Sequence, residues 1–449
     1  MKANKVWLFS DLLEKNRRVF KVPVYQRNYN WTSIQCQKLY KDIMKASELD
    51  IQHFTGTVVY IEDTVGSRLN EVLIIDGQQR ITTVYILLQA LYDATKNISA
   101  RIRNEIHDVM FNRNCKEEYK VKLKPVKSDN QQLLLLISGK IDDMDRNSNV
   151  YKNYITFKKL IDDTLKEGNK FEDILEGIKQ LEIVEIILDK SQKDKPQKIF
   201  ESINSTGLEL SLADLIRNYL LMDDENQDEL YNEYWLEIEK NVEYENLENF
   251  FINFLNSQIN KTVNVKNAYR LFQEYCEEKE SNHKEILSIL KQISKYYGAF
   301  IGTINPYENE IAKYLKAFAT IKQTTVLPFI FRIFNDFENK HISKNDLCNV
   351  LEYLLTYLIR IISCERSNNL AKFMKSLYIR AINSEFNNYS IRFIAFLNNL
   401  KANDRMPSDK EFKEALLYKP LYKKTICRFI LSSIENSSKE KIDTSNLTI

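Results

Sequence analysis

The sequence predicts an α+β protein in which an N-terminal α/β domain is followed by a mostly α-helical domain. Three β-branched runs have the length and composition of strands, and all three lie in the first half of the chain. They are "FTGTVVYIE" (54–62), "EVLIID" (71–76) and "LEIVEIIL" (181–188). Beyond about residue 226 the strand pattern fades and apolar residues recur at helical spacing, as in "KEILSILKQISKYYGAFIG". We therefore expect one domain over residues 1–225 and an all-helical domain over 226–449.

Length and composition support this division and leave the function open. A chain of 449 residues is longer than one core usually organises, and its 9 glycines and 7 prolines are too few for long flexible linkers. The net charge of +2 is too small to predict a nucleic-acid binder by itself. No apolar stretch is long enough to span a bilayer, the N-terminus does not resemble a signal peptide, and the six cysteines form no CxxC pair. We therefore expect a cytoplasmic protein with no membrane partner.

The first two strand runs predict a hairpin or two adjacent strands, the second of which leads directly into a helix. A polar turn around Gly66-Ser67 separates the two runs. After Arg80 the apolar residues fall three and four positions apart, which predicts a helix. These apolar residues are Ile81, Val84, Leu88 and Leu91.

Helices surround the third strand. A charged loop near 139–149 precedes a helix predicted over 151–165, and the strand comes after them. The segment 195–222 then predicts a helix, a glycine-containing turn and a second helix. Ser211 followed by Asp214 is a capping pattern for the start of that second helix.

Polar residues are concentrated where the second strand becomes a helix, in "IIDGQQRITT". They are Asp76, Gly77, Gln78, Gln79, Arg80, Thr82 and Thr83. A helix N-terminus attracts anions, glycine permits close approach or positive φ, and Arg80 can grip phosphate oxygens through two N–H groups. Asp76 can act as a base or hold a magnesium–phosphate complex, and Gln79 can orient a water. The alternative is a helix start capped by Asp76, with the other polar groups facing solvent.

A second cluster, "VPVYQRNYNW", interleaves aromatic, amide and guanidinium groups. Its main residues are Tyr25, Gln26, Arg27, Tyr29 and Trp31. Such a mixture suits stacking on bases or binding phosphate. For Gln26 and Arg27 we favour a functional role. The alternative is that Tyr29 and Trp31 are core anchors beneath a loop, with Arg27 pairing internally. For Trp31 alone we favour the core anchor.

A third cluster, "FESINSTG", places Phe200 and Asn204 four residues apart and so on one face of a helix. Phe200 would anchor the core while Asn204 faces a ligand. Alternatively, Asn204 lies near a helix C-terminus that Gly207 ends.

Taken in order, "PVYQRNYNW", "IIDGQQRITT" and "IFESINSTGLELSLADLIRNYLL" resemble the N-terminal domain of GmrSD-type restriction endonucleases, which are type IV, modification-dependent enzymes. The resemblance covers roughly residues 5–225. Weaker similarity continues in "KLKPVKSDN" (122–130) and in the helical half.

The resemblance implies a fold similar to that of ParB and sulfiredoxin, which binds and hydrolyses a nucleoside triphosphate with magnesium. It implies catalytic roles for Asp76, Gln79 and Arg80 and a DNA-sensing role for Tyr25, Gln26 and Arg27. The residues that it implies for nucleotide binding are Gly77, Gln78, Thr82, Thr83, Arg27, Phe200 and Asn204. The base of the nucleotide is left open. Because Asp76 and Arg80 are expected to be exposed loop residues, alanine at either position should cost little folding stability.

Relatives in this family cut DNA that carries modified bases or a modified backbone, often with an HNH nuclease domain. The chain has histidines at His53, His107, His283 and His341, so none lies in its last hundred residues. We therefore expect the nuclease to be a domain beyond Ile449 or a separate subunit, which the helical half would control. The alternatives are a sensor that binds nucleotide or DNA without turnover, and a nicking nuclease within the N-terminal half. A homo-oligomer is compatible with the sequence.

Overall fold

The computed structural model describes residues 2–65, 69–188, 210–222, 226–366 and 369–436. The chain divides into two compact units, which we call the N-terminal unit (Met1–Leu210 with Arg217–Asp228) and the helical unit (Ser211–Ile216 with Glu229–Ile449). The division falls inside helix α8 (Leu212–Leu221). Ser211 caps this helix, because its Oγ accepts the Asp214 N–H at 3.2 Å while the Asp214 carboxylate accepts the Ser211 hydroxyl at 2.8 Å. The predicted capping pair is therefore confirmed.

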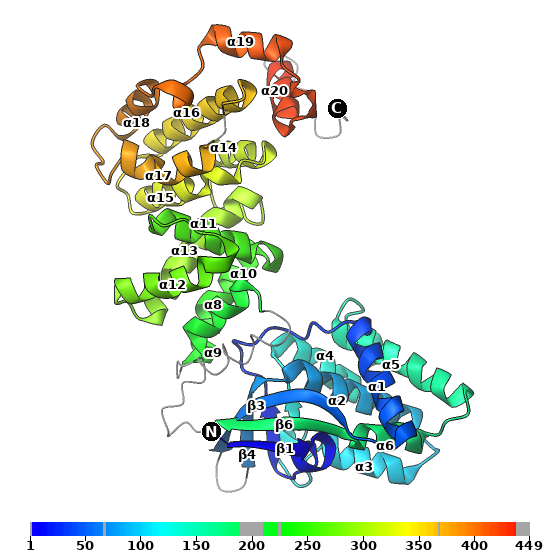
Figure 1. Ribbon diagram of the computed structural model, residues 1–449. Coiled ribbons are helices and arrows are strands. Elements are labelled where there is room, and N and C mark those ends of the chain that lie inside the picture. The colour runs from blue at the N-terminus through cyan, green and yellow to red at the C-terminus, as the bar shows by residue number, and fades with distance from the viewer. Residues whose placement is uncertain (1, 66–68, 189–209, 223–225, 367–368, 437–449) are drawn as a thin grey trace. The chain divides into compact units, whose positions relative to one another are not determined.

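A six-stranded mixed sheet organises the N-terminal unit, in the order β1-β6-β3-β4-β2-β5 (Figure 1). The strands are β1 (Lys2–Trp7), β2 (Arg18–Lys21), β3 (His53–Val65), β4 (Leu69–Asp76), β5 (Leu123–Lys124) and β6 (Leu181–Leu188). β3 and β4 form the predicted antiparallel hairpin, and the predicted third strand, β6, pairs with β3 in parallel. The sequence did not predict β1, β2 or β5, because they are short or carry alternating lysines and asparagine.

The sheet brings the last residues of β4 beside the middle of β3. This follows from their antiparallel pairing, in which Val59 lies opposite Asp76. The parallel pairing of β3 with β6 is interrupted by a bulge between Phe54 and Gly56. Bulges turn side chains in new directions at the edge of a sheet. The polar residues at the end of β4 therefore meet a distorted stretch of β3.

Helices α1 (Ser33–Leu49), α2 (Gln78–Ala94), α5 (Asn149–Lys166) and α6 (Phe171–Lys179) lie beside these strands (Figure 1). α1 packs on both α5 and α6, and α2 packs on α5. Every residue of α2 from Ile81 to Leu91 is buried, so α2 is the central helix of the unit. α3 (Ala100–Met110) and α4 (Lys127–Ile137) complete the helical layer. The predicted helix at 151–165 is confirmed as α5, and a short 3-10 turn (Ile141–Asp143) lies within the predicted loop before it.

Lys122 is a buried lysine that ties three segments of this unit together. Its Nζ donates hydrogen bonds to the carbonyl oxygens of Leu13 (3.0 Å), Glu14 (3.1 Å) and Asp108 (2.7 Å). Burial lowers the pKa of the ammonium group to about 8, against the opposing charges of Asp108 and Glu14. The three carbonyl oxygens satisfy the three N–H donors of the ammonium group. The three segments are therefore joined here by hydrogen bonds to one buried lysine.

The helical unit confirms the predicted loss of strands after residue 226. Its described helices, in chain order, are α9 (Gln227–Leu230), α10 (Leu236–Val242), α11 (Leu247–Gln258), α12 (Val265–Lys279), α13 (His283–Ile301), α14 (Asn309–Thr320), α15 (Leu327–Glu338), α16 (Lys344–Ser363), α17 (Leu370–Ala381), α18 (Tyr389–Asn398), α19 (Asp409–Tyr418) and α20 (Thr425–Glu435). α13 and α15 are central, since α13 contacts α10 and α14 while α15 contacts α11 and α17. None of the helices in the described part of the chain has the length and apolarity needed to cross a membrane.

Candidate functional site

The junction between β4 and α2 depends on Gly77. The residue is the N-cap of α2 and has φ +94°, as the sequence predicted. A Cβ at this position would also lie 2.9 Å from Val58 Cγ2 and 3.1 Å from the Thr57 carbonyl oxygen. Any other residue would be strained and would push β3 away from the start of α2.

Three glutamines fasten this junction to the segment 25–31, and we call them the glutamine clasp (Gln26, Gln78 and Gln79). Gln79 Oε1 accepts the backbone N–H groups of Asn30 (2.9 Å) and Trp31 (3.2 Å). Its Nε2 donates to the carbonyl oxygen at position 28 at 3.1 Å. The three amide groups are buried, and together they make the two sequence motifs one hydrogen-bonded body.

The other two glutamines of the clasp donate hydrogen bonds in opposite directions between the two segments. Gln78 Nε2 donates to the Arg27 carbonyl oxygen at 2.8 Å, and Gln26 Nε2 donates to the Ile75 carbonyl oxygen at 2.8 Å. The alternative in which the polar groups of α2 simply face solvent is therefore wrong for Gln78 and Gln79, whose side chains are buried. The roles predicted for Gln79 in catalysis and for Gln78 in nucleotide binding stay predictions.

Thr82 and Thr83 are buried as well. Thr83 Oγ1 donates to the Gln79 carbonyl oxygen at 2.7 Å and lies 2.7 Å from the Tyr29 hydroxyl. Tyr29 itself belongs to the core, and the partly buried Trp31 packs against that core. The core-anchor interpretation is thus confirmed for Tyr29. The nucleotide-binding role of Thr82 and Thr83 stays a prediction.

Buried groups also hold the two ends of the segment 25–31. Tyr25 is buried, and its carbonyl oxygen accepts the Arg217 Nε–H at 2.9 Å. The Tyr29 N–H donates to Asp129 Oδ2 at 2.6 Å. Burial raises the pKa of the Asp129 carboxyl to about 6, although this hydrogen bond opposes the shift. Asp129 belongs to "KLKPVKSDN", so that weaker motif contacts the second cluster directly.

Arg80 lies in the first turn of α2, half-buried against β3. Its Nη1 donates to the Thr57 carbonyl oxygen. Gly56, at the bulge, has φ +116°, and a Cβ there would lie 2.8 Å from Arg80 Cζ. The guanidinium group therefore rests on the bare backbone of a glycine, and this contact and the hydrogen bond to Thr57 fix its position.

Asp76 and Arg27 share the neighbourhood of Arg80. Burial raises the pKa of the Asp76 carboxyl, while the charges of Arg80 and Arg27 and a hydrogen bond from the Gly77 N–H oppose the rise. Both Asp76 and Arg80 are half-buried, so the expectation that they are exposed loop residues is wrong. The structure thus brings Asp76, Arg80 and Arg27 together at the head of α2.

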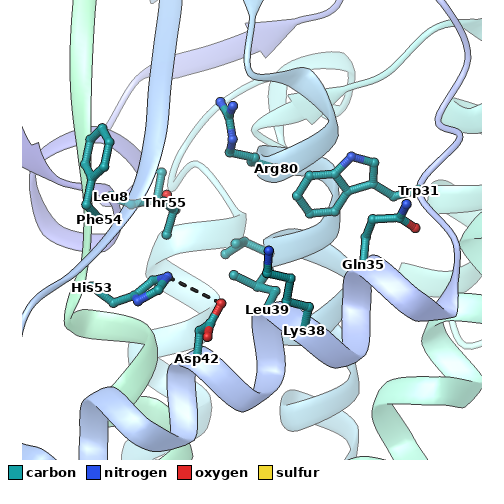
Figure 2. Close-up of a pocket in the computed structure, with 11 residues that line it drawn as sticks. Leu8, Trp31, Gln35, Lys38, Leu39, Asp42, His53, Phe54, Thr55 and Arg80 are labelled. Carbon is teal, nitrogen blue, oxygen red and sulfur yellow. Dashed lines mark ion pairs between the residues drawn. The ribbon is translucent and has the colours of Figure 1, made fainter. Parts of the chain in front are cut away.

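Arg80 also lines a cavity of about 550 Å³ within the N-terminal unit (Figure 2). The cavity is bounded by the start of β3, one face of α1, the first turns of α2 and the segment before α1. Its lining residues are Leu8, Trp31, Gln35, Lys38, Leu39, Asp42, His53, Phe54, Thr55, Arg80 and Val84. Figure 2 shows Arg80 and Trp31 toward one end and the pair His53–Asp42 toward the other.

The cavity can bind an anion joined to a flat ring. Arg80 and Lys38 supply positive charge, while Trp31 and Phe54 supply aromatic surface. His53 Nε2 lies 3.6 Å from Asp42 Oδ2, within ion-pair distance. In the described residues no group of three or more His, Cys, Asp or Glu could hold a metal ion by itself.

The sequence motifs did not identify most of this wall. Gln35, Lys38 and Asp42 are three and four residues apart on α1 and so share one face. That spacing was a signal, but polar residues on an amphipathic helix are more often a solvated surface. Phe200 and Asn204, in contrast, lie outside the described residues, so their role in nucleotide binding stays a prediction.

Residues 9–221 match the family model described as the GmrSD restriction endonuclease, N-terminal domain. This part of the chain therefore belongs to the GmrSD N-terminal domain family, and the chain carries a restriction-system domain. A search of curated proteins finds no match. The predicted family is confirmed, whereas its expected similarity to ParB and sulfiredoxin stays a prediction.

Proposed function

We propose that the N-terminal unit binds and hydrolyses a nucleoside triphosphate, senses modified DNA, and regulates an HNH nuclease in another domain or subunit. The observation that carries the proposal is the position of Arg80, which is fixed on Gly56 beside Asp76 and lines a cavity with a second cation and two aromatic rings. The family match supports a role in restriction, in which nucleotide turnover would be coupled to attack on DNA.

Phosphate binding would use Arg80 and Lys38. The guanidinium group can donate two parallel hydrogen bonds to phosphate oxygens, and Lys38 adds a mobile point charge from α1. The helix dipole of α2 adds positive potential at the same end. Trp31 and Phe54 would then pack on the nucleobase, which a cavity of about 550 Å³ has room to enclose.

Asp76 is the residue that we assign to activating water. Its raised pKa makes the carboxylate a stronger base than an exposed aspartate, and the adjacent guanidinium stabilises the charge that develops on the phosphate. Magnesium usually enters such sites bound to the triphosphate and to one or two carboxylates, which Asp76 or Asp42 could provide. The metal would supply neutralisation of phosphate charge.

DNA sensing would fall to the part of segment 25–31 that solvent can reach. Tyr25 and Gln26 are buried, whereas Arg27 is half-buried and Asn28 and Asn30 are exposed. We assign the DNA contact to Arg27 and these asparagines, and we give Tyr25 and Gln26 the task of positioning them. Since Gln79 binds the backbone of the same segment, a change at the head of α2 would be transmitted to the DNA-contacting residues.

Phosphate release tests the proposal, measured with a panel of nucleotides in the presence and absence of several modified DNAs. Arg80→Gln should lower kcat/KM roughly 100-fold. Arg101→Gln is the matched control, because Arg101 is an exposed arginine of α3 whose ion-pair partner among the described residues is its helix neighbour Glu105. Normal turnover in Arg80→Gln would place the chemistry elsewhere. Tight nucleotide binding without any phosphate release would favour the second candidate, a sensor that recruits its nuclease without turnover.

A further inference from the structure

A second cavity, of about 470 Å³, lies within the helical unit. Residues of α12, α13, α15 and α17 line it, together with the turns that follow α15 and α17. Its walls include the aromatic rings of Tyr275, Tyr378 and Phe386. Lys279 and His341 are exposed residues at its border, and the His341 ring lies 4.3 Å from that of Phe386.

Arg332 on α15 brings a positive charge into this cavity. Its Nε donates to the Ser257 carbonyl oxygen at 2.5 Å, and its guanidinium lies 5.0 Å from the centre of the Tyr378 ring. Burial lowers the pKa of the guanidinium, against the charges of Tyr378 and Asp336. Across the described residues, no carboxylate lies within ion-pair distance of this arginine.

Asp336 lies one turn further along α15 and brings a negative charge to the same cavity. It is only 5% exposed. Its Oδ2 accepts hydrogen bonds from the Tyr378 and Tyr389 hydroxyl groups, both at 2.8 Å. Oδ1 has no hydrogen-bond partner in the part of the chain that the structure describes. Burial raises the pKa of this carboxyl, although both tyrosines oppose the shift.

Arg332 and Asp336 are spaced i, i+4, which normally allows an ion pair on one helix face. Here they stay apart, because Ser257 holds the arginine and two tyrosines hold the aspartate. Keeping opposite charges buried and separate is costly, and a more stable core could be built from apolar residues. Such an arrangement is expected where a ligand completes the hydrogen bonds of both groups.

We propose that this cavity binds a nucleobase together with its phosphate. The Asp336 carboxylate can accept from a ring N–H or amino group, and the Arg332 guanidinium can donate to a neighbouring ring nitrogen or carbonyl, as base edges require. Tyr275, Tyr378 and Phe386 provide faces for stacking. Lys279 binds the phosphate at the border. The site is separate from the nucleotide cavity of the N-terminal unit and does not depend on its function.

The nucleotide can come from two sources, a free mononucleotide or an unpaired residue of a DNA strand. Both present the same base edge and phosphate. Calorimetric titration of the full chain distinguishes them, with the four nucleoside monophosphates and short single-stranded oligonucleotides as probes. Arg80→Gln is included in the background of every variant, so that the N-terminal cavity contributes little to the signal.

Saturable binding is expected, and Arg332→Gln should weaken it at least tenfold. Asp336→Asn should change which base binds best, because the side chain then both donates and accepts. Arg405→Gln is the matched control, since Arg405 pairs with Glu411 of α19 and does not line the cavity. Its affinity should equal that of the parent.

Thermal unfolding of each variant shows whether the fold is retained. If Arg332→Gln unfolds, Lys279→Gln replaces it, because Lys279 is exposed. This variant should bind the nucleoside monophosphates more weakly than the parent, while the corresponding nucleosides, titrated as additional probes, should bind equally well. Binding of oligonucleotides alone assigns the site to DNA, and binding of mononucleotides alone assigns it to a free ligand. The proposal is overturned if no probe binds, or if affinity is the same in folded Arg332→Gln or Lys279→Gln as in the parent.

Discussion

Gly56 and Arg80 show how one residue without a side chain can position a charged one. Gly56→Ala should lower phosphate release about as much as Arg80→Gln, because the new Cβ would lie 2.8 Å from Arg80 Cζ and move the guanidinium. The positive φ adds a strain of about 1–2 kcal/mol. Phosphate-release kinetics and the midpoint of thermal unfolding measure the two effects separately.

Gly168→Ala separates strain from contact in that experiment. Gly168 also has a positive φ, +96°, but a Cβ there would meet no atom within 4 Å. The Gly168→Ala variant should therefore lose about as much stability as Gly56→Ala and keep full phosphate-release activity. Equal activity in both alanine variants would mean that Gly56 does not position Arg80.

Asp129 leads to a prediction about pH. Its pKa is raised to about 6 in the folded chain, above the unfolded value of 3.8, so the folded state holds this proton more tightly. The group's contribution to stability is complete below about pH 4 and is lost as the pH rises through about 6. Asp129→Asn keeps an acceptor for the Tyr29 N–H and should raise the unfolding free energy by about 1–3 kcal/mol at pH 8.

The gain from Asp129→Asn should fall to a small fraction of its pH 8 value near pH 4, where the carboxyl is protonated in the folded state and partly protonated in the unfolded state. Midpoints of thermal unfolding at pH 8 and pH 4, compared between the variant and the parent, measure this. An equal gain at both pH values would show that charge is not the cause.

The sequence identified some of these residues and not others, for physical reasons. Gly77 was predictable, because a glycine between a strand and a helix has few uses other than positive φ or close approach. Gly56 was not, since its bulge depends on pairing with β6, far along the chain. The burial of Gln78 and Gln79 was also hidden, because their partners are backbone atoms of another segment.

At the scale of elements, the glutamine clasp makes segment 25–31 and α2 a single body. Gln79→Ala would remove hydrogen bonds to the backbone of residues 28, 30 and 31. We expect amide hydrogen exchange at Asn30 and Trp31 to accelerate roughly tenfold to 100-fold, since a hydrogen bond contributes about 1 kcal/mol and two are lost there. Hydrogen exchange followed by mass spectrometry measures this.

Gln132→Ala is a suitable control, because Gln132 accepts a single backbone N–H, from Asp145 on the surface. Exchange at positions 30 and 31 should be unchanged in this variant. Unchanged exchange in Gln79→Ala as well would show that other contacts hold the segment in place.

The strands that could be predicted are those that contain a run of several β-branched residues, β3, β4 and β6. β2 has four residues and β5 only two, and each is a strand because of the neighbour with which it pairs. The wall of the cavity around Arg80 likewise combines α1 with the start of β3. Such a site depends on tertiary packing, which local patterns do not encode.

At the scale of the whole molecule, each cavity is lined by residues of one unit. A ligand should therefore stabilise the unit that binds it. At 100 times its dissociation constant, a ligand contributes about 2.7 kcal/mol to that unit, which corresponds to roughly 5–10 °C in its unfolding midpoint. In an Arg332→Gln background, which removes nucleotide binding at the cavity of the helical unit, we expect calorimetry to show a nucleoside triphosphate raising one transition, and Arg80→Gln to cancel that shift while the other transition is unaffected. A triphosphate shift that survives Arg80→Gln would argue against this cavity.

A further prediction concerns the division of labour that we propose for the restriction system. We expect residues 1–449 alone to leave modified DNA intact in the presence of magnesium and nucleotide, because the nuclease chemistry is assigned to an HNH domain or subunit. An agarose-gel cleavage assay measures this, with addition of the nuclease partner as the positive control. Cleavage by the chain alone that disappears in Asp76→Ala would place the nuclease in the N-terminal unit.

The order of the two halves could be predicted from the sequence, because strand patterns stop before the long helical region. The cavity around Arg332 and Asp336 could not. Arg332 and Asp336 each fit the pattern of an amphipathic helix. Their separation depends on tertiary contacts, of Arg332 with Ser257 and of Asp336 with the tyrosines of α17 and α18.

The buried amine of Lys122 can report on how often the N-terminal unit opens. Acylating reagents modify only an uncharged amine that they can reach, and Lys122 is fully enclosed by the unit while bound to three carbonyls. Its labelling must wait for the unit to open, whereas exposed lysines react at once. The labelling rate of this side chain, followed by peptide mass spectrometry, would therefore measure the rate at which the N-terminal unit opens. It would also show whether nucleotide or DNA slows this opening.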